Sequence, residues 1–313
     1  MAKNKTIVIV TPLLNEEANI NIFYKKYMAV AKKIKGFHVS FLFVDDGSKD
    51  TTWEVLTKLT KKTKNVSAVK LSRNFGSYIA LPAGLETAYK KNYDYFIMTT
   101  VDLQNPPELL PKLIAKLNSG ARVVFGTRHE RVEGLSGIFS NIFWYFIQHF
   151  ALPNAPTGGT DYCLIDRKVA HDLVTSSEKN SHIFNIIVWL GYHQESVPFE
   201  RKKILGRKSR WTIQKKIKLL IDTFVAFSYT PIRLVTYMGL TTSFLGFIYA
   251  ALVVLRRIFF NIKIEGWSSL MFIVLVLFGI NMIMLGIIAE YLWRTFDASR
   301  KRPLYLIDEE LNT

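Results

Sequence analysis

A carboxylate and a carboxamide lie two residues apart within TTVDLQNPP at 99–107, and they are the first candidates for chemistry in this chain. The apolar run YDYFIM precedes this segment and is typical of a buried strand. Because the Pro-Pro step stops a strand or a helix from continuing at once, we expect Asp102 and Gln104 on a short loop beyond that strand. Their oxygen atoms suit a hard divalent cation that also binds phosphate, although a solvated turn would have the same residues.

More carboxylates follow another expected strand, HVSFLFV at 38–44, which leads directly into Asp45 and Asp46. The carboxyl ends of parallel strands meet at one edge of a sheet, and open α/β sheets bind their ligands at that edge. We therefore expect Asp45 and Asp46 to converge with Asp102 on one site.

Two cationic side chains are expected at the same edge. A strand at 123–127 leads into Arg128 and Arg131, whose guanidinium groups suit phosphate. Ordinary surface charges are the alternative for each arginine. The segment TDYCLI at 160–165 adds one more carboxylate, Asp161.

The elements that must position these side chains alternate between strand and helix. TIVIVT at 6–11 reads as a first strand that ends at Pro12, and a helix is expected to start near Asn15 or Glu16. A third strand at 66–71 is followed by a loop and another helix. This alternation predicts an α/β fold with a mostly parallel sheet and right-handed crossovers.

Composition points to a membrane and to anionic partners. The 313 residues carry a formal net charge of +16, yet 49% of them are hydrophobic and the mean hydropathy is +0.14. Two apolar runs dominate the C-terminal part of the chain, and most basic residues precede them. A basic excess fits nucleic acid, a membrane surface or an anionic substrate, and the apolar runs favour the last two. The one cysteine, Cys163, excludes an intramolecular disulfide and is expected in the core.

Two apolar segments, 234–255 and 270–292, are each long enough to cross a hydrocarbon core of roughly 30 Å. Lys and Arg residues are concentrated outside the loop between them, so we expect both chain ends on the cytoplasmic side of the inner membrane. Gly279, Asn281 and Gly286 lie in the second segment and indicate helix packing, within one protomer or between protomers.

Two further segments are expected at the membrane surface. The aromatic-rich segment 135–152 is too polar to span a bilayer and reads as an amphipathic interfacial helix, with a core helix as the alternative. The basic run at 200–211 leads into an amphipathic helix within 211–230, where lysines near a membrane attract anionic head groups.

Taken in order, the motifs resemble family 2 glycosyltransferases with a GT-A fold. Within that family they resemble the polyprenyl-phosphate glycosyltransferases, which include dolichyl-phosphate mannose synthases and bactoprenol glucosyltransferases. The resemblance covers nearly the whole chain, and the order and spacing of its motifs make it specific. The motifs are TPLLNEEANI, VDDGSKDTT, SRNFG, VDLQNPPELLPKLI, GTRHER, GGTDYCLIDR, the KSRW run and the RPLY tail after the paired C-terminal helices.

The resemblance implies a domain plan and a donor site. The plan has a GT-A catalytic domain at 1–210, a juxtamembrane helix at 211–230, and a transmembrane hairpin with a cytoplasmic tail at 231–313. Asp102 and Gln104 are implied to hold Mg²⁺ or Mn²⁺ on the donor diphosphate. The residues implied to bind the nucleotide sugar are Pro12, Glu16, Asp45, Asp46 and Thr100.

The remaining implied roles concern the reacting sugar and the phosphates. Asp161 matches an acidic position close to the sugar, so it joins Asp102 as a candidate catalytic residue. The residues implied to bind donor or acceptor phosphate are Arg128, Arg131, Ser209 and Arg210.

Three positions depart from the family pattern. Thr100 stands where the family usually has an acidic residue, so only Asp102 remains of an Asp-Ala-Asp-Leu-Gln motif. Leu14 stands where Tyr is often found, and Gly206 comes one residue early in the basic run. The first departure bears directly on how strongly a cation is bound.

The implied activity is the inverting transfer of a single sugar to undecaprenyl phosphate at the cytoplasmic face, which gives a lipid-linked monosaccharide for cell-envelope glycan modification. The expected donor is a UDP-hexose or UDP-N-acetylhexosamine, and the expected assembly is a homo-oligomer such as a tetramer. One alternative is a transferase acting on a lipid-linked oligosaccharide or glycan polymer, for which two spans are too few to build a channel. A membrane-tethered scaffold is the other. Nucleic acid is not an expected partner, because the basic residues are interleaved with membrane-facing segments rather than with stacking aromatics.

Overall fold

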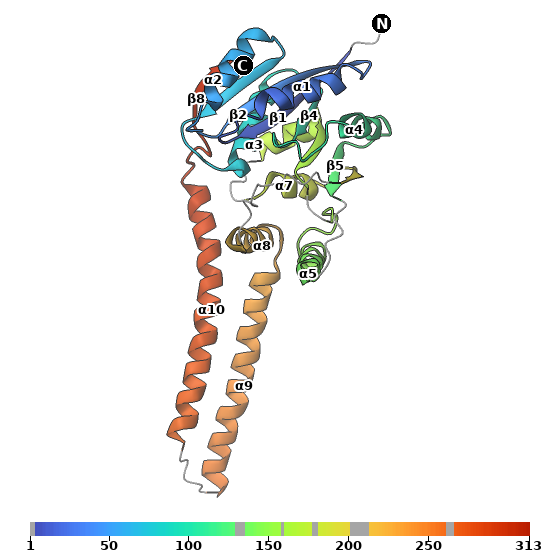
Figure 1. Cartoon of the computed structure of the whole chain (residues 1–313). Coiled ribbons are helices and arrows are strands. Elements are labelled where there is room, and N and C mark those ends of the chain that lie inside the picture. The colour runs from blue at the N-terminus through green and yellow to red at the C-terminus, as the bar shows by residue number, and fades with distance from the viewer. Residues whose placement is uncertain (1–3, 129–134, 158–159, 177–180, 201–212, 261–265) are drawn as a thin grey trace. The chain divides into compact units, whose positions relative to one another are not determined.

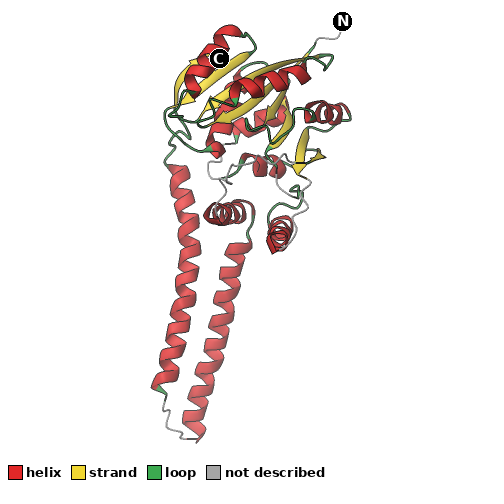
Figure 2. Cartoon of the chain, in the orientation of Figure 1, coloured by secondary structure: helices red, strands yellow, loops and turns green. Residues whose placement is uncertain are grey.

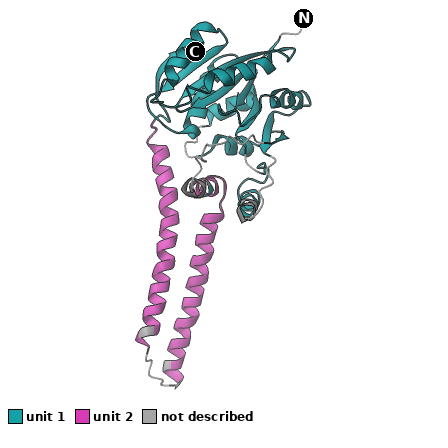
Figure 3. Cartoon of the chain, in the orientation of Figure 1, with its two compact units in different colours: residues 1–220, 303–313 teal, residues 221–302 magenta. Residues whose placement is uncertain are grey.

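The computed structural model describes residues 4–128, 135–157, 160–176, 181–200, 213–260 and 266–313, and the chain divides into two compact units (Figure 1 and Figure 3). Unit 1 comprises residues 1–220 and 303–313, and unit 2 comprises residues 221–302. The C-terminal tail, expected to accompany the transmembrane hairpin, is therefore grouped with unit 1.

Unit 1 is built on an eight-stranded sheet with the order β7-β5-β6-β4-β1-β2-β3-β8. The pairs β1–β2, β1–β4, β2–β3 and β5–β7 are parallel, whereas β6 runs antiparallel to β4 and β5, and β8 runs antiparallel to β3. The mostly parallel α/β sheet is thus confirmed. The strands are β1 (Lys5–Leu13), β2 (Phe37–Asp45), β3 (Val66–Leu71), β4 (Tyr95–Met98), β5 (Val123–Arg128), β6 (Tyr162–Asp166), β7 (Gln194–Phe199) and β8 (Ile307–Leu311).

Helices cover both faces of this sheet (Figure 2). On one face, Ile9 of β1 shares a buried core with Phe23 of α1. On the other face, a Cβ added to Gly84 of α3 would lie 2.5 Å from Cγ1 of Val10 and from Cγ2 of Val44, so this helix packs directly on the strands. The helices are α1 (Ile20–Ala31), α2 (Thr52–Lys62), α3 (Ser77–Lys90), α4 (Leu109–Asn118), α5 (Leu135–Phe150), α6 (Arg167–Thr175), α7 (Ile183–Trp189) and α8 (Ile213–Phe227), which contains the unit boundary.

Strand β1 continues through Pro12 to Leu13, so the expected end of this strand at Pro12 is wrong. The neighbouring β4 pairs with β1 only as far as Met98, which lies opposite Val10, and Val10 O accepts the next hydrogen bond from Thr99 N. The backbone groups of consecutive residues in a strand point to opposite neighbouring strands, so Pro12, two residues after Val10, faces the β4 side, where β4 has already ended. Its missing N–H therefore leaves no ladder hydrogen bond unmade.

Helix α1 begins at Ile20, later than the expected start near Asn15 or Glu16. Asn15 has a φ of 54°, in the left-handed region, which is incompatible with a helix at that point. Its Oδ1 accepts a hydrogen bond from Lys49 N at 2.9 Å, and its N donates to Ser48 Oγ at 2.9 Å. The residues after β1 are therefore used to hold the loop that follows β2.

Helix α5, Leu135–Phe150, confirms a helix over most of the segment 135–152. Among its described side chains, Ile147 is buried, whereas Tyr145 is 61% exposed and Phe146 and Phe150 are also exposed. A helix in the hydrophobic core of unit 1 would bury these rings. Their exposure therefore does not fit the alternative that this segment is a core helix. Insertion of α5 at a membrane interface stays a prediction.

Unit 2 contains two long helices, α9 (Thr230–Phe260) and α10 (Trp267–Ser299), each with a segment long and apolar enough to cross a membrane. Where the two helices meet, a Cβ added to Gly239 would lie 3.2 Å from Cε of Met284. Gly279 and Gly286 have open space at their Cβ positions, and Asn281 is exposed. Packing of these three residues within the protomer is not seen in the described part of the chain, and packing between protomers stays a prediction.

Candidate functional site

The strand directions bring the candidate residues to one edge of the sheet. Strands β1, β2 and β4 are parallel, and β5 runs the same way as β4 because both are antiparallel to β6. The carboxyl ends of β2, β4 and β5, which carry Asp45, Asp102 and Arg128, therefore share this edge. Strand β6 starts there, which places Asp161, the residue before it, at the same edge.

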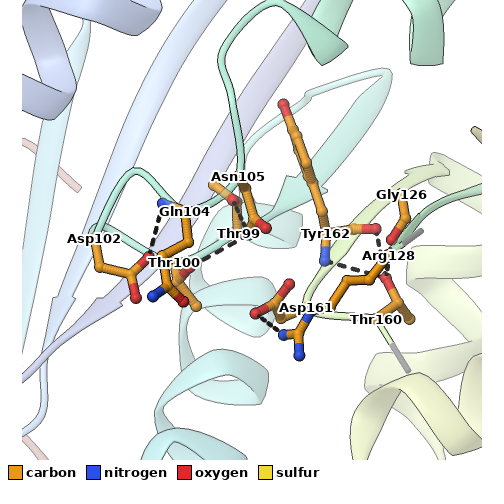
Figure 4. Close-up of polar contacts among 10 residues, drawn as sticks. All are labelled: Thr99, Thr100, Asp102, Gln104, Asn105, Gly126, Arg128, Thr160, Asp161 and Tyr162. Carbon is orange, nitrogen blue, oxygen red and sulfur yellow. Dashed lines mark hydrogen bonds and ion pairs between the residues drawn. The ribbon is translucent and has the colours of Figure 1, made fainter. Parts of the chain in front are cut away.

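The turn after β4 holds Asp102 by two hydrogen bonds to one carboxylate oxygen (Figure 4). Thr100 Oγ1 donates to Asp102 Oδ1 at 2.9 Å, and Gln104 N donates to the same atom at 3.2 Å. Between them Leu103 has a φ of 57°, a left-handed conformation that is strained for a leucine. Leu103 is partly buried against the core, and this packing offsets the strain.

Asn105 anchors this turn from beneath. Its side chain is fully buried, and its Nδ2 donates to Thr99 Oγ1 at 3.2 Å and to Thr100 Oγ1 at 3.3 Å. Its backbone oxygen accepts a hydrogen bond from the hydroxyl of Tyr27 at 3.2 Å. Burial raises the pKa of Tyr27 to about 12, so this hydroxyl keeps its proton at neutral pH.

The donor set of this turn fits a hard divalent cation. Gln104 Oε1 is buried and has no hydrogen-bond partner, which is unfavourable for an amide oxygen unless a ligand completes the site. Asp102 supplies a carboxylate beside it, and hard cations prefer such oxygen ligands. The described residues contain no cluster of three or more His, Cys, Asp or Glu side chains that could hold a metal.

The two carboxylates at the carboxyl end of β2, Asp45 and Asp46, differ in which groups they bind. Asp46 accepts hydrogen bonds at Oδ1 from Phe75 N at 2.7 Å and at Oδ2 from Gly76 N at 2.8 Å, so both of its oxygens hold the loop after β3. Asp45 accepts one from Ser48 N at 3.0 Å, while its Oδ2 is buried and accepts none. Burial is the main reason that the pKa values of both Asp45 and Asp46 are raised. The free acceptor therefore lies on Asp45 rather than on Asp46.

Glu16 and Pro12 lie next to this region on β1 and the segment after it. Glu16 is 6% exposed, and its Oε2 accepts a hydrogen bond from Asn19 Nδ2 at 2.6 Å. Its backbone N donates to Thr52 Oγ1 at 2.9 Å, at the start of α2. Pro12 is partly buried and pairs with Val44 in the register of β1 and β2. Both residues thus lie close to the Asp45 loop.

Arg128 and Asp161 form an ion pair between the end of β5 and the start of β6 (Figure 4). The close approach of these strands depends on Gly126, where a Cβ would lie 3.1 Å from Cβ of Tyr162. Thr160 Oγ1 donates to the backbone oxygen of Gly126 at 2.8 Å, which fixes the segment leading into Asp161. The other predicted phosphate-binding residues, Arg131, Ser209 and Arg210, lie outside the described residues.

The sequence pattern missed the supporting residues Asn105, Tyr27, Thr160 and Gly126. Asn105 had one available signal, because it joins the candidate ligands to the Pro-Pro step and a buried amide there needs hydrogen-bond partners. Its Nδ2 has two such partners, whereas its buried Oδ1 has none among the described residues. Tyr27 lies in the apolar face of α1 and resembles any core residue. Cys163 was expected in the core, and its thiol is fully buried there.

Comparison with known proteins places the chain in a family. Residues 8–174, more than half of the chain, match the model described as Glycosyl transferase family 2. A protein named "Uncharacterized glycosyltransferase YkcC" from Bacillus subtilis (strain 168) is 32% identical over 99% of this chain and 95% of its own length. The "Prophage bactoprenol glucosyl transferase homolog" of Escherichia coli (strain K12) is 33% identical over 96% of this chain and 98% of its own length. Among solved structures, UDP-bound glucosyl-3-phosphoglycerate synthase from Mycobacterium tuberculosis aligns with a TM-score of 0.49 and 17% identity over 71% of this chain and 78% of that one.

Proposed function

Because this chain belongs to glycosyl transferase family 2, we propose that it transfers a single sugar from a nucleotide sugar to a polyprenyl phosphate. The observation that carries the proposal is the convergence of Asp45, Asp102 and Arg128 at one sheet edge in a chain with two apolar helices of membrane-spanning length. The relative from Escherichia coli, named for bactoprenol glucosyl transfer, matches both parts of the chain.

The donor is proposed to be a UDP-hexose or UDP-N-acetylhexosamine bound over the ends of β1, β2 and β4. The buried Oδ2 of Asp45 would accept a hydrogen bond from the nucleoside. Asp102 and Gln104 would hold Mg²⁺ or Mn²⁺ against the diphosphate. When bound, that cation would neutralise negative charge on the leaving diphosphate.

In the proposed reaction, a phosphate oxygen of the lipid forms a bond to the anomeric carbon while the bond from that carbon to the diphosphate breaks. The electron pair of the broken bond stays on the diphosphate. Because the second pKa of a phosphomonoester is about 6, the attacking oxygen is ionised at neutral pH and no strong base is required. Asp161 would orient the acceptor or stabilise positive charge at the sugar, and Arg128 would bind phosphate. Single displacement inverts the anomeric centre.

The acceptor lipid is proposed to be undecaprenyl phosphate, reached from the cytoplasmic face of the inner membrane. The spans Thr230–Arg256 and Ser269–Ser299 would form the anchor, and the exposed rings of α5 would lie at the interface. The glycines at 279 and 286 would pack against a second copy, giving a homo-oligomer such as a tetramer.

The test is a transfer assay with full-length protein in lipid nanodiscs, labelled UDP-sugars, Mn²⁺ and undecaprenyl phosphate. We expect a lipid-linked monosaccharide by mass spectrometry from at least one donor, and at least a 100-fold loss in Asp102→Ala, as expected when a group that organises the reacting charge is removed. Asp308→Ala, at an exposed carboxylate of β8, is the matched control and should retain activity. If no donor gives product, or if Asp102→Ala equals the parent, the proposal is wrong. A ladder of products would instead indicate a polymerising transferase.

A further inference from the structure

A line of hydrogen bonds connects the buried core to the carboxylate of Asp102 (Figure 4). Asn105 Nδ2 donates to Thr100 Oγ1 at 3.3 Å, and Thr100 Oγ1 donates to Asp102 Oδ1 at 2.9 Å. Asn105 is fully buried and is itself held by the hydroxyl of Tyr27 at 3.2 Å, while Asp102 is only partly buried. These hydrogen bonds therefore run from the buried Asn105 to Asp102, whose carboxylate must face a ligand.

The chemistry of the three groups sets the direction of these hydrogen bonds. An ionised carboxylate only accepts, and the amide nitrogen of Asn105 only donates. The hydroxyl of Thr100 lies between them and can do both, so it accepts from Asn105 and gives its own hydrogen to Asp102. A valine at position 100 would have nearly the same shape but could do neither.

Both donors to Asp102 use the same oxygen. The hydroxyl of Thr100 and the backbone N of Gln104 converge on Oδ1, and Oδ2 accepts no hydrogen bond from a described residue. Two donors on one oxygen fix the rotation of the carboxylate and leave the other oxygen available for a cation. An acidic residue at position 100 would instead set a second acceptor against Oδ1.

We propose that Thr100 and Asn105 are positioning residues that orient the carboxylate of Asp102 for the divalent cation of the donor complex. This inference rests on the proposed function, in which Asp102 binds that cation. Thr100 thereby takes over, as a neutral hydrogen-bond donor, a position at which a carboxylate would add charge. The site has one carboxylate on this turn, so its affinity for the cation depends on how well that single group is held.

The test measures binding of UDP to the full-length protein by calorimetry while the Mn²⁺ concentration is varied, with no sugar transfer involved. We expect Thr100→Val to raise the Mn²⁺ concentration needed for half-maximal UDP binding about 10-fold, at the low end of the effect of removing a hydrogen-bond partner of a metal ligand. Thr100→Ser keeps the hydroxyl and should restore the parent value. Thr100→Val also takes one acceptor from the buried amide of Asn105, so its melting temperature without ligand should fall by a few degrees, whereas Thr100→Ser should melt like the parent. At saturating Mn²⁺ all three proteins should bind UDP equally well, which a general loss of structure would not give.

Asn105→Asp tests the other end of the line. A carboxylate at this position would accept the hydrogen of the Thr100 hydroxyl and draw it away from Asp102, so we expect the same rise in the Mn²⁺ requirement. Thr175→Val, at an exposed threonine at the end of α6, is the matched control for Thr100→Val, and its Mn²⁺ requirement should equal that of the parent. If Asn105→Asp does not fold, Thr100→Val decides the question alone.

The two proposals fail in different ways. If the parent protein binds UDP without any dependence on Mn²⁺ or Mg²⁺, the cation site of the proposed function is wrong. If the parent shows that dependence but Thr100→Val has the same Mn²⁺ requirement, the cation site stands and the positioning role is wrong.

Discussion

Arg128 at the end of β5 donates a hydrogen bond from Nη2 to Oδ2 of Asp161, the residue before β6, and each side chain is only 20% exposed. The pair joins a candidate phosphate-binding group to the carboxylate expected near the reacting sugar. A charge-assisted pair of this kind fixes both groups more firmly than a neutral hydrogen bond would. Neither residue can therefore be changed without affecting the other.

We expect Arg128→Met to lower sugar transfer at least 100-fold, because it removes the proposed phosphate ligand and releases Asp161. In a double-mutant cycle with Asp161→Asn, the two losses should be clearly less than additive, since both variants break one pair. The measurement is the single-turnover rate for each variant.

The chain offers a matched control for this cycle at the opposite end of the same two strands. Arg122 Nη1 pairs with Asp166 Oδ2 at 3.1 Å, next to β5 and β6 and away from the candidate site. Arg122→Met should therefore leave the transfer rate near that of the parent. Fully additive losses for Arg128→Met and Asp161→Asn would contradict a functional link between them.

Replacing Asp45 should have opposite effects on the stability of the fold and on UDP binding. Its pKa is raised chiefly by burial, so its contribution to stability is present below the pKa of the unfolded chain and is lost as pH rises through the folded value. Above that folded value the charged, buried carboxylate is therefore destabilising. Asp45→Asn should raise the melting temperature at pH 7 by about 2–4 °C, the shift that about 1 kcal/mol gives in a domain of this size, and this gain should shrink as pH falls toward 4.

The same Asp45→Asn variant should bind UDP more weakly, because the amide nitrogen replaces the buried Oδ2 acceptor. Calorimetric titration with UDP measures this directly. A variant that is more stable and still binds UDP like the parent would show that Oδ2 does not contact the nucleotide.

The sequence placed the polar residues at or beyond the carboxyl ends of β2, β4 and β5 on one sheet edge, but it did not identify the residues that hold them there. Asp45, Asp102 and Arg128 could be placed on one edge because an apolar strand followed by a polar residue carries a direct signal. Asn105 could not be assigned a role, because its partners are hydroxyl groups and a backbone oxygen that only the folded turn brings together. The start of α1 was missed for a similar reason, since Asn15 is held by a loop more than thirty residues away.

Strand β8 shows a second limit of sequence patterns. Its sequence IDEEL contains three acidic residues and lacks the β-branched alternation of a strand. It pairs at the sheet edge with the main chain of β3, from Ala68 opposite Leu311 to Leu71 opposite Ile307. Its acidic side chains are accommodated there by partners on neighbouring elements, such as Glu309 with Lys70 at 2.9 Å and with Trp53 Nε1 at 3.1 Å. Pairing across 239 residues of sequence is decided by tertiary contacts rather than by local propensity.

A substitution at Gly47 tests whether the loop after β2 and the loop after β3 depend on each other. It has a φ of +69°, and a Cβ there would lie 2.6 Å from the carbonyl carbon of Arg73. Gly47→Ala should therefore push this backbone away and weaken the hydrogen bonds from Phe75 and Gly76 to Asp46. We expect a loss of about 2–4 kcal/mol of stability, combining left-handed strain with overpacking, together with weaker UDP binding.

Gly36→Ala is the matched control for this change. Gly36 has a φ of +79° but open space at its Cβ position, so only the backbone strain of about 1–2 kcal/mol applies and UDP binding should be unchanged. Urea denaturation measures both stabilities. Equal losses for the two variants would mean that the contact between the loops contributes nothing.

The C-terminal tail should stabilise the catalytic sheet through Asn312. Its Nδ2 donates to the backbone oxygens of Thr60 at 3.0 Å and Val66 at 3.2 Å, which ties the chain end to α2 and β3. Its φ of 53° is left-handed, a conformation that asparagine tolerates better than alanine does. Asn312→Ala should therefore lower the free energy of unfolding of unit 1 by about 2 kcal/mol, from two lost hydrogen bonds and added strain.

Hydrogen exchange gives a local measurement of the same effect. In Asn312→Ala the amides of β3 and β8 should lose protection, because these strands pair along the sheet edge that the chain end holds, while those of the interior strand β4 should not. Glu309→Gln is the control, since its exposed side chain can still accept from Trp53 and an exposed ion pair contributes at most about 1 kcal/mol. Unchanged protection of β8 in Asn312→Ala would mean that strand pairing alone holds the tail to the sheet.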